Sequence, residues 1–259
     1  AVIGVVIFIL PFLAKIYMIF ILLAGITWML RSRNKNNEAL LISSYIVGVE
    51  VFLRMTEGNF FEQYAKYGVM GVLLIGMFFK GFSKNAIPYW VFLILLIPGL
   101  LVATETLNLT TDLRKTISFN ISGPICLGIS SIYTYNKPIS LAKINQILLC
   151  IGLPIISITV YLILYTPDLK EALVLGTGSN YTTSGGFGPN QVATMFGLSM
   201  FIFFSRLMLE SETRLLFALN LIITFLVTYR GLITFSRGGM ITGFVMILLL
   251  LMLLGVPMY

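Results

Sequence analysis

Charge is scarce in this chain. Only 10% of its 259 residues are charged and 58% are hydrophobic, whereas an average soluble domain carries about 25% charge. This composition excludes an ordinary soluble globule, a disordered chain and a coiled coil. The mean hydropathy of +0.97 indicates that lipid is the solvent for most of the chain.

Absent and rare residue types remove several kinds of site. The sequence has no His, so it lacks the commonest general base and a common metal ligand. Its two cysteines, Cys126 and Cys150, lie in separate apolar runs and form no metal or redox motif. No carboxylate cluster suits Mg²⁺. We therefore expect no metal site. We also expect no cofactor and no nucleic-acid partner.

Long apolar runs are abundant, and charged or turn residues separate them. A bilayer-spanning helix needs about 20 residues, so the length allows roughly ten spans. We predict a single all-α domain over 1–259, a polytopic transmembrane helical bundle. Its segments are 1–13, 16–30, 39–53, 67–80, 89–104, 121–134, 146–165, 189–208, 215–235 and 239–257. Alternatively, 1–30 is one long helix kinked at Pro11.

Loop charges predict the orientation of this bundle. Side one comprises the loops that hold residues 31–38, 80–84, 137–143 and 206–214, and side two comprises the alternate loops. Side one carries nine of the 17 Lys and Arg residues but only three of the 10 Asp and Glu residues. Cytoplasmic loops favour Lys and Arg, so we place side one in the cytoplasm and side two outside.

A glycine-rich stretch at 176–191 leads into one segment on side two. It contains Gly188, Asn190 and Gln191, and Pro189 suits a first helical turn. The free N–H groups and positive dipole end of that helix favour an anion. No strand precedes the stretch, so it is not a nucleotide fingerprint. The alternative is a flexible polar loop before a proline-initiated helix.

Two arginines flank a short turn on the same side. Arg230 and Arg237 lie between long apolar segments, where an Arg costs about 2.5–3.5 kcal/mol on insertion scales. Ser236 fits as the cap of the last segment, and Gly238 permits close backbone approach. We predict that the two helix starts together clamp a diphosphate. The alternative is a tight hairpin whose arginines reach outward to lipid headgroups.

Two further groups carry charge on side two. Glu50 and Arg54 have the i, i+4 spacing of an ion pair, which serves either a substrate or the orientation of helices. Arg114 and Lys115 lie in a loop of mixed charge. Arg114 is a weaker ligand candidate, and a solvated loop is the default interpretation.

These segments resemble the bacterial O-antigen ligase and O-antigen polymerase superfamily. The resemblance is carried by GGFGPNQVA at 185–193, by LITFSRGG at 232–239, by the Glu50–Arg54 pair and by the run 114–124. It covers nearly the whole chain in span order. It implies a GT-C-like, metal-independent glycosyltransferase core in the bacterial inner membrane. The resemblance further implies that the donor is a glycan on undecaprenyl diphosphate at the periplasmic face and that the acceptor is a saccharide or lipid A-core sugar.

By the matching motif, Arg237 contacts the diphosphate, with Arg54, Arg114, Arg230 and Asn190 as neighbours. The family also has a large periplasmic loop whose Arg and His are needed by ligases, and this chain has no His. We therefore expect an N-terminal fragment, truncated at its C-terminus, that holds part of the donor site; the alternative is an inactive or divergent member. Catalytic residues stay unassigned.

Two other classes of protein compete with this interpretation. One is a transporter or flippase for an anionic lipid-linked substrate, which typically places polar groups near the midplane of a repeated architecture. The other is a structural membrane subunit whose arginines only reach the headgroups. The notable polar groups here lie at helix ends and no repeat is evident, which favours the glycan transferase.

Overall fold

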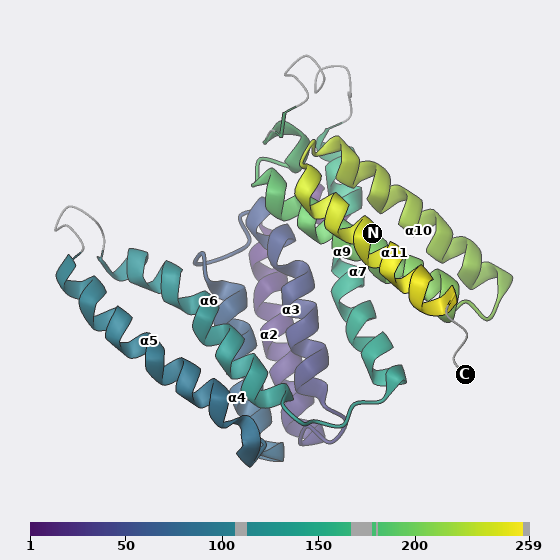
Figure 1. Ribbon diagram of the computed structural model, residues 1–259. Helices are drawn as coiled ribbons and strands as arrows, with labels where there is room; N and C mark the ends of the chain where they lie inside the picture. Colours follow the sequence, from purple (N-terminus) through teal and green to yellow (C-terminus); the bar gives the residue numbers. More distant parts are fainter. Residues whose placement is uncertain (107–112, 167–177, 180, 256–259) are drawn as a thin grey trace. The chain divides into compact units, whose positions relative to one another are not determined.

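The described chain is built from helices alone. The computed structural model describes residues 1–106, 113–166, 178–179 and 181–255. Within these residues there are ten α-helices and two short 3₁₀ helices (Figure 1). They are α1 (Val2–Ile9), α2 (Leu13–Ser32), α3 (Glu38–Met55), α4 (Tyr64–Lys80), η1 (Lys84–Ala86), α5 (Ile87–Thr106), α6 (Leu113–Thr134), α7 (Leu141–Tyr165), η2 (Thr182–Ser184), α9 (Pro189–Leu209), α10 (Arg214–Ile233) and α11 (Arg237–Gly255).

Each predicted apolar segment corresponds to one α-helix in the same order, so the all-α prediction is confirmed. The single kinked helix over 1–30 is not observed, because α1 ends at Ile9 and Pro11 lies in the turn before α2. Helix α6 begins earlier than predicted, at Leu113. Its polar residues fit a helix by bonding to the backbone, as Asn120 Nδ2 does to the Thr116 carbonyl at 3.0 Å.

Six of the described helices are long and apolar enough to cross a membrane. They are Leu13–Ser32, Lys84–Ala103, Leu141–Tyr165, Pro189–Leu209, Arg214–Ile233 and Arg237–Gly255. By contrast, α1 has eight residues, which rise only about 12 Å against a hydrocarbon core of about 30 Å. The segment predicted at 1–13 therefore falls short of a span. The six helices support a multi-pass membrane protein.

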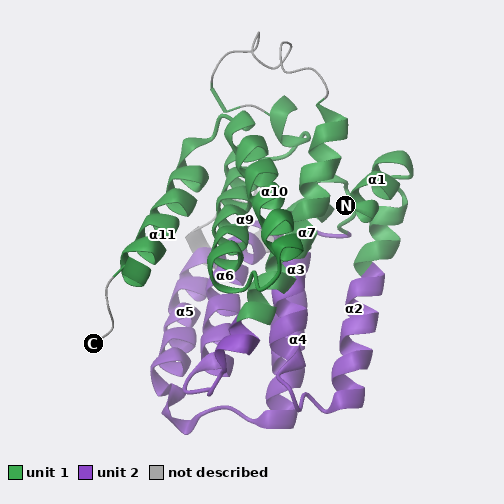
Figure 2. Ribbon diagram, turned by 90° about the vertical axis from the view of Figure 1, so that its right-hand side faces the viewer, with its two compact units in different colours: residues 1–18, 48–59, 145–259 green, residues 19–47, 60–144 purple. Residues whose placement is uncertain are grey.

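The chain divides into two compact units (Figure 2). Unit 1 comprises residues 1–18, 48–59 and 145–259, and unit 2 comprises residues 19–47 and 60–144. The boundary passes through α2 and α3, so each unit receives one end of these helices.

Close helix packing forms the core of unit 1. Helix α9 contacts α10 and α11 (Figure 1). A Cβ atom on Gly197 of α9 would meet the Gly239 carbonyl oxygen of α11, and one on Gly243 would meet the Gly197 carbonyl oxygen. Small residues at these positions let the two backbones approach, which is a common way for helices to associate in lipid.

A buried asparagine links the side-one helix ends of unit 2. Asn34 is fully buried, and its Nδ2 donates to the Gly76 carbonyl oxygen at 3.2 Å and to Tyr133 Oη at 2.9 Å. Its Oδ1 accepts from the Ala39 backbone N–H at 3.0 Å. The ends of α2, α4 and α6 and the start of α3 therefore meet, as the predicted alternation of side-one loops requires.

Candidate functional site

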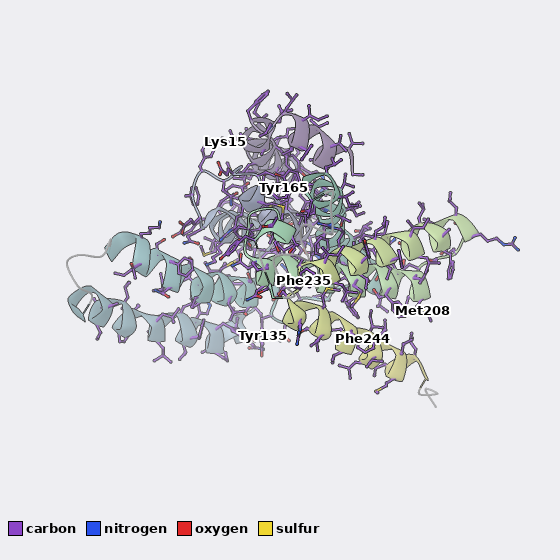
Figure 3. The ribbon with its side chains drawn as sticks, turned by 90° about the horizontal axis from the view of Figure 1, so that it is seen from above. Lys15, Tyr135, Tyr165, Met208, Phe235 and Phe244 are labelled. Carbon is purple, nitrogen blue, oxygen red and sulfur yellow. The ribbon has the colours of Figure 1, made fainter. Side chains whose placement is uncertain are left out.

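One end of unit 1 collects most of the residues predicted from the sequence. The C-terminal turns of α3 and α10 and the first turns of α9 and α11 carry them. Figure 3 places Phe235 at the end from which α10 and α11 extend, and Met208 near the opposite end of α9. Six of the seven predicted binding residues belong to unit 1: Gly188, Asn190, Gln191, Arg54, Arg230 and Arg237.

A hydrogen bond joins the starts of α9 and α11. The Ser236 hydroxyl donates to Asn190 Oδ1 at 2.8 Å. Gly188 is the N-cap of α9 and Pro189 is its first residue, where the missing N–H of proline costs nothing. Ser236 was expected to cap the last helix, but the contact that the structure shows runs from one helix start to the other. Two positive dipole ends therefore lie beside each other.

The turn between α10 and α11 aims Ser236 at α9. Thr234 Oγ1 donates to the Gly231 carbonyl oxygen at 2.7 Å and accepts from the Ser236 backbone N–H at 3.3 Å. Phe235 has a φ of 54°, a left-handed conformation that costs a residue with a side chain about 1–2 kcal/mol. Strained backbone of this kind persists where the surroundings fix it, which is common at binding sites.

A groove of about 460 Å³ lies between these two helices. Its polar lining comes from Asn190, Thr194, Ser236 and Thr242, and the backbone of Gly238, Gly239 and Gly243 completes that part. Leu198 and Met246, which lie further along the two helices, add apolar lining. The groove therefore offers polar groups at the helix starts and apolar side chains further along the helices. None of the three predicted arginines of unit 1, Arg54, Arg230 and Arg237, lines it.

Arg54 is held beside the loop that enters α9. Its Nη2 lies 2.9 Å from Glu50 Oε1, so the predicted i, i+4 ion pair is confirmed, and both side chains are mostly buried. The guanidinium carbon also lies 5.8 Å from the centre of the Phe187 ring, within the range of a cation–π interaction. Arg54 thus connects α3 to the glycine-rich loop.

Arg230 and Arg237 differ sharply in their surroundings. Arg230, in the last turn of α10, is only 3% exposed, and its Nε and Nη2 atoms have no hydrogen-bond partner in the described part of the chain. Burying such a charge without partners is costly. Arg237 is the first residue of α11 and is exposed. One guanidinium is therefore buried with two of its nitrogens unsatisfied by the described residues, and the other is exposed.

The remaining predicted residues, Gln191 and Arg114, are not among the described residues that line the groove. Gln191 is exposed on the first turn of α9, where its backbone N–H donates to the Gly188 carbonyl oxygen at 3.1 Å. Arg114 belongs to α6 of unit 2, and its side chain lies outside what the structure describes. Of the predicted glycine-rich loop, residues 176–177 and 180 lie outside the described residues.

Sequence reasoning missed how α9 and α11 approach each other. Gly239 and Gly243 form a G-x-x-x-G pattern, and Ala193 and Gly197 form the matching small-residue pair on α9. That spacing places small residues on one helix face and marks close packing in lipid. This spacing of small residues could have predicted from the sequence that these two helices pack together. Nothing in the sequence indicated that Arg230 would be more buried than Arg237.

The described residues contain no group of three or more His, Cys, Asp or Glu side chains that could hold a metal ion. Cys126 and Cys150 are free thiols. Comparison with protein-family models, with curated proteins and with solved structures finds no match to the chain.

Proposed function

We propose that the chain forms the membrane core of a glycosyltransferase of the O-antigen ligase or polymerase type. It would transfer a glycan from undecaprenyl diphosphate to a saccharide or lipid A-core acceptor, at the periplasmic face of the bacterial inner membrane. The observation that carries the proposal is the 2.8 Å bond from Ser236 to Asn190. It unites the two segments, 185–193 and 232–239, on which the family resemblance is based.

The chemistry of the leaving group explains why arginines would gather here. When the bond between the sugar and the diphosphate breaks, negative charge grows on the diphosphate, and fixed positive groups stabilise it. Arginine reads phosphate with two parallel N–H donors and needs no metal. Arg237 would bind the diphosphate, with Arg230, Arg54 and the backbone N–H groups of α9 and α11 around it.

The groove between α9 and α11 supports a lipid-linked substrate. Its polar end, at Asn190 and Ser236, suits the headgroup, whose diphosphate would extend beyond the groove to Arg237, the residue that follows Ser236. Its apolar lining by Leu198 and Met246 suits the first part of a polyprenyl chain. A soluble anion would need only the polar end.

Surface polysaccharide in cells that carry single substitutions tests the proposal. Arg237→Ala is expected to abolish the polysaccharide without lowering the level of the protein, and Arg237→Lys is expected to fail as well because bidentate contact is lost. Arg214→Ala, an exposed arginine at the opposite end of α10, serves as the matched control. Normal polysaccharide with Arg237→Ala would remove this residue from the site.

The same cells separate transfer from transport. If Arg237→Ala cells accumulate the lipid-linked glycan at the outer face, the chain acts after export, as a transferase does. If the glycan fails to reach that face, the chain moves the substrate, and the proposed function is wrong.

A further inference from the structure

Unit 2 contains a second hollow, of about 640 Å³. It lies on side two, where the loop before α4, the first turn of α4 and the start of α6 meet. Its volume falls in the range of about 300–1,000 Å³ that small-ligand sites occupy. None of the binding residues predicted from the sequence lines it. We refer to this hollow as the aromatic pocket.

Exposed aromatic rings form one wall of the aromatic pocket. Phe60 is 60% exposed and Phe61 is 49% exposed. The Phe61 ring centre lies 5.8 Å from that of Tyr67, with the two planes tilted by 53°. The contact with Tyr67 holds the Phe61 ring in place, and the exposed surface of both Phe rings is available for a flat apolar ligand surface to stack against.

Polar groups form the rest of the aromatic pocket. Tyr67 Oη and Ser118 Oγ lie 2.7 Å apart and join α4 to α6. Lys115 Nζ lies 3.1 Å from Glu62 Oε1, and both of these side chains are more than half exposed. Both links join the segment that contains α4 and the loop before it to the start of α6. Because the cation and the carboxylate are paired, they give this rim no net charge.

Gln63 supplies the observation that points to a ligand. It is only 6% exposed, and its Oε1 atom is buried without a hydrogen-bond partner within the described ranges. Although Gln63 is the N-cap of α4, its side chain makes no capping bond. An unsatisfied buried acceptor of this kind destabilises the protein that holds it. Gln63 is among the residues that line the aromatic pocket, so a ligand whose binding turned its amide toward the pocket would deliver a donor to this acceptor.

We propose that the aromatic pocket binds a neutral pyranose sugar. Such a ring has apolar C–H faces, which would stack on Phe60 and Phe61, and hydroxyl groups at its edge. A sugar hydroxyl both donates and accepts, so it can donate to Gln63 Oε1 while it accepts from Tyr67 or Ser118. The site fits the glycan transfer proposed above, but none of the observations that carry it comes from unit 1.

Direct binding of free sugars to the whole chain tests this site separately from transfer. The chain is placed in phosphatidylcholine nanodiscs, because glycoside detergents would occupy a sugar site. Saturation-transfer NMR then measures how tightly the chain binds methyl glucoside, methyl galactoside and N-acetylglucosamine. We expect at least one to bind, and Phe60→Ala to weaken it about tenfold, since an aromatic contact contributes up to about 1.5 kcal/mol.

Two further variants make the result decisive. Gln63→Leu keeps the size and burial of the side chain but removes its acceptor, and is expected to weaken binding by a similar factor. Phe78→Ala is the matched control, because Phe78 lies on α4, is 87% exposed and is not part of the aromatic pocket. Its affinity should equal that of the unchanged chain.

Several outcomes would overturn the proposal. If no sugar binds, Phe60 and Phe61 belong to an aromatic belt at the membrane interface. If a sugar binds equally well to the unchanged chain, to Phe60→Ala and to Gln63→Leu, it binds elsewhere. Neither result affects Arg237 and the diphosphate, because loss of surface polysaccharide in Arg237→Ala cells is measured independently.

Discussion

At the scale of single residues, Arg230 shows how stability and binding conflict at this site. A buried cation without a partner destabilises the protein that holds it, and replacing even a buried ion pair by apolar groups is often neutral or stabilising by about 1–4 kcal/mol. Arg230 is buried and two of its nitrogens lack partners among the described residues. Its retention makes sense if an anion completes its hydrogen bonds.

Arg230→Met is therefore expected to raise the stability of the ligand-free chain by about 1–3 kcal/mol and to abolish surface polysaccharide. Arg54→Met is the comparison, because Arg54 already has Glu50 as its partner at 2.9 Å, so its removal should destabilise the chain. Thermal unfolding in nanodiscs measures both. Loss of stability in Arg230→Met would mean that the guanidinium has a structural partner and is not held for a ligand.

Lys137, in the loop between α6 and α7, is a second cation that is partly buried, and its burial makes stability depend on pH. Burial and the nearby charge of Lys80 lower its pKa to about 8, even though its Nζ lies 3.3 Å from the centre of the Tyr133 ring, which favours the cation. The folded chain therefore binds this proton less tightly than the unfolded chain does. Between that value and the ordinary lysine value near 10.5, folding is favoured increasingly as pH rises.

We expect the difference in stability between the unchanged chain and Lys137→Met to depend on pH. Raising the pH from about 8 towards 10.5 should stabilise the unchanged chain relative to the variant, because the buried amine loses its charge over that window. Melting temperatures at several pH values measure the difference. A difference that stays constant with pH would show that Lys137 titrates as an ordinary lysine.

At the scale of elements, the contact between α9 and α11 decides whether the groove exists. A Cβ atom on Gly239 would meet the backbone of Ala193 and Thr194, whereas one on the adjacent Gly238 would meet nothing within 4 Å. The two neighbouring glycines thus offer a matched pair. One is required by close packing, and the other stands in open space.

Gly239→Ala is expected to destabilise the chain by about 1–3 kcal/mol, the usual cost of forcing a methyl group into a packed contact. Gly238→Ala is expected to be neutral or stabilising by up to about 1 kcal/mol, because alanine favours a helix over glycine. Unfolding of the two variants under the same conditions gives the comparison. Equal effects would mean that α9 and α11 do not pack through Gly239.

The elements themselves could be predicted from the sequence better than their contacts. Apolar runs predicted all ten described helices, and the i, i+4 spacing predicted the Arg54–Glu50 pair. A membrane helix is apolar on every side, however, so periodicity does not say which face meets a neighbour. The groove, the burial of Arg230 and the hydrogen bonds of Asn34 depend on such contacts between distant segments, and they appeared only in the structure.

At the scale of the whole molecule, the starts of α9 and α11 must face outward if they bind a donor at the periplasmic face. Tyr181, beside η2, is exposed on side two, and Glu212, between α9 and α10, is exposed on side one. Single cysteines at these positions, with Cys126 and Cys150 changed to Ala, report the topology. A membrane-impermeant maleimide should label Tyr181→Cys in intact inner-membrane spheroplasts, and Glu212→Cys only after permeabilisation. The reverse pattern would place the candidate site in the cytoplasm.

The affinity of the chain for undecaprenyl diphosphate tests the central claim most directly. In nanodiscs, the unchanged chain and Arg214→Ala are expected to bind it equally well. Arg237→Ala should bind at least about tenfold more weakly, since a hydrogen bond to a charged group contributes about 1.5–3 kcal/mol. Uncharged undecaprenol should bind weakly to all three. Equal affinity of the unchanged chain and Arg237→Ala for the diphosphate would contradict the account.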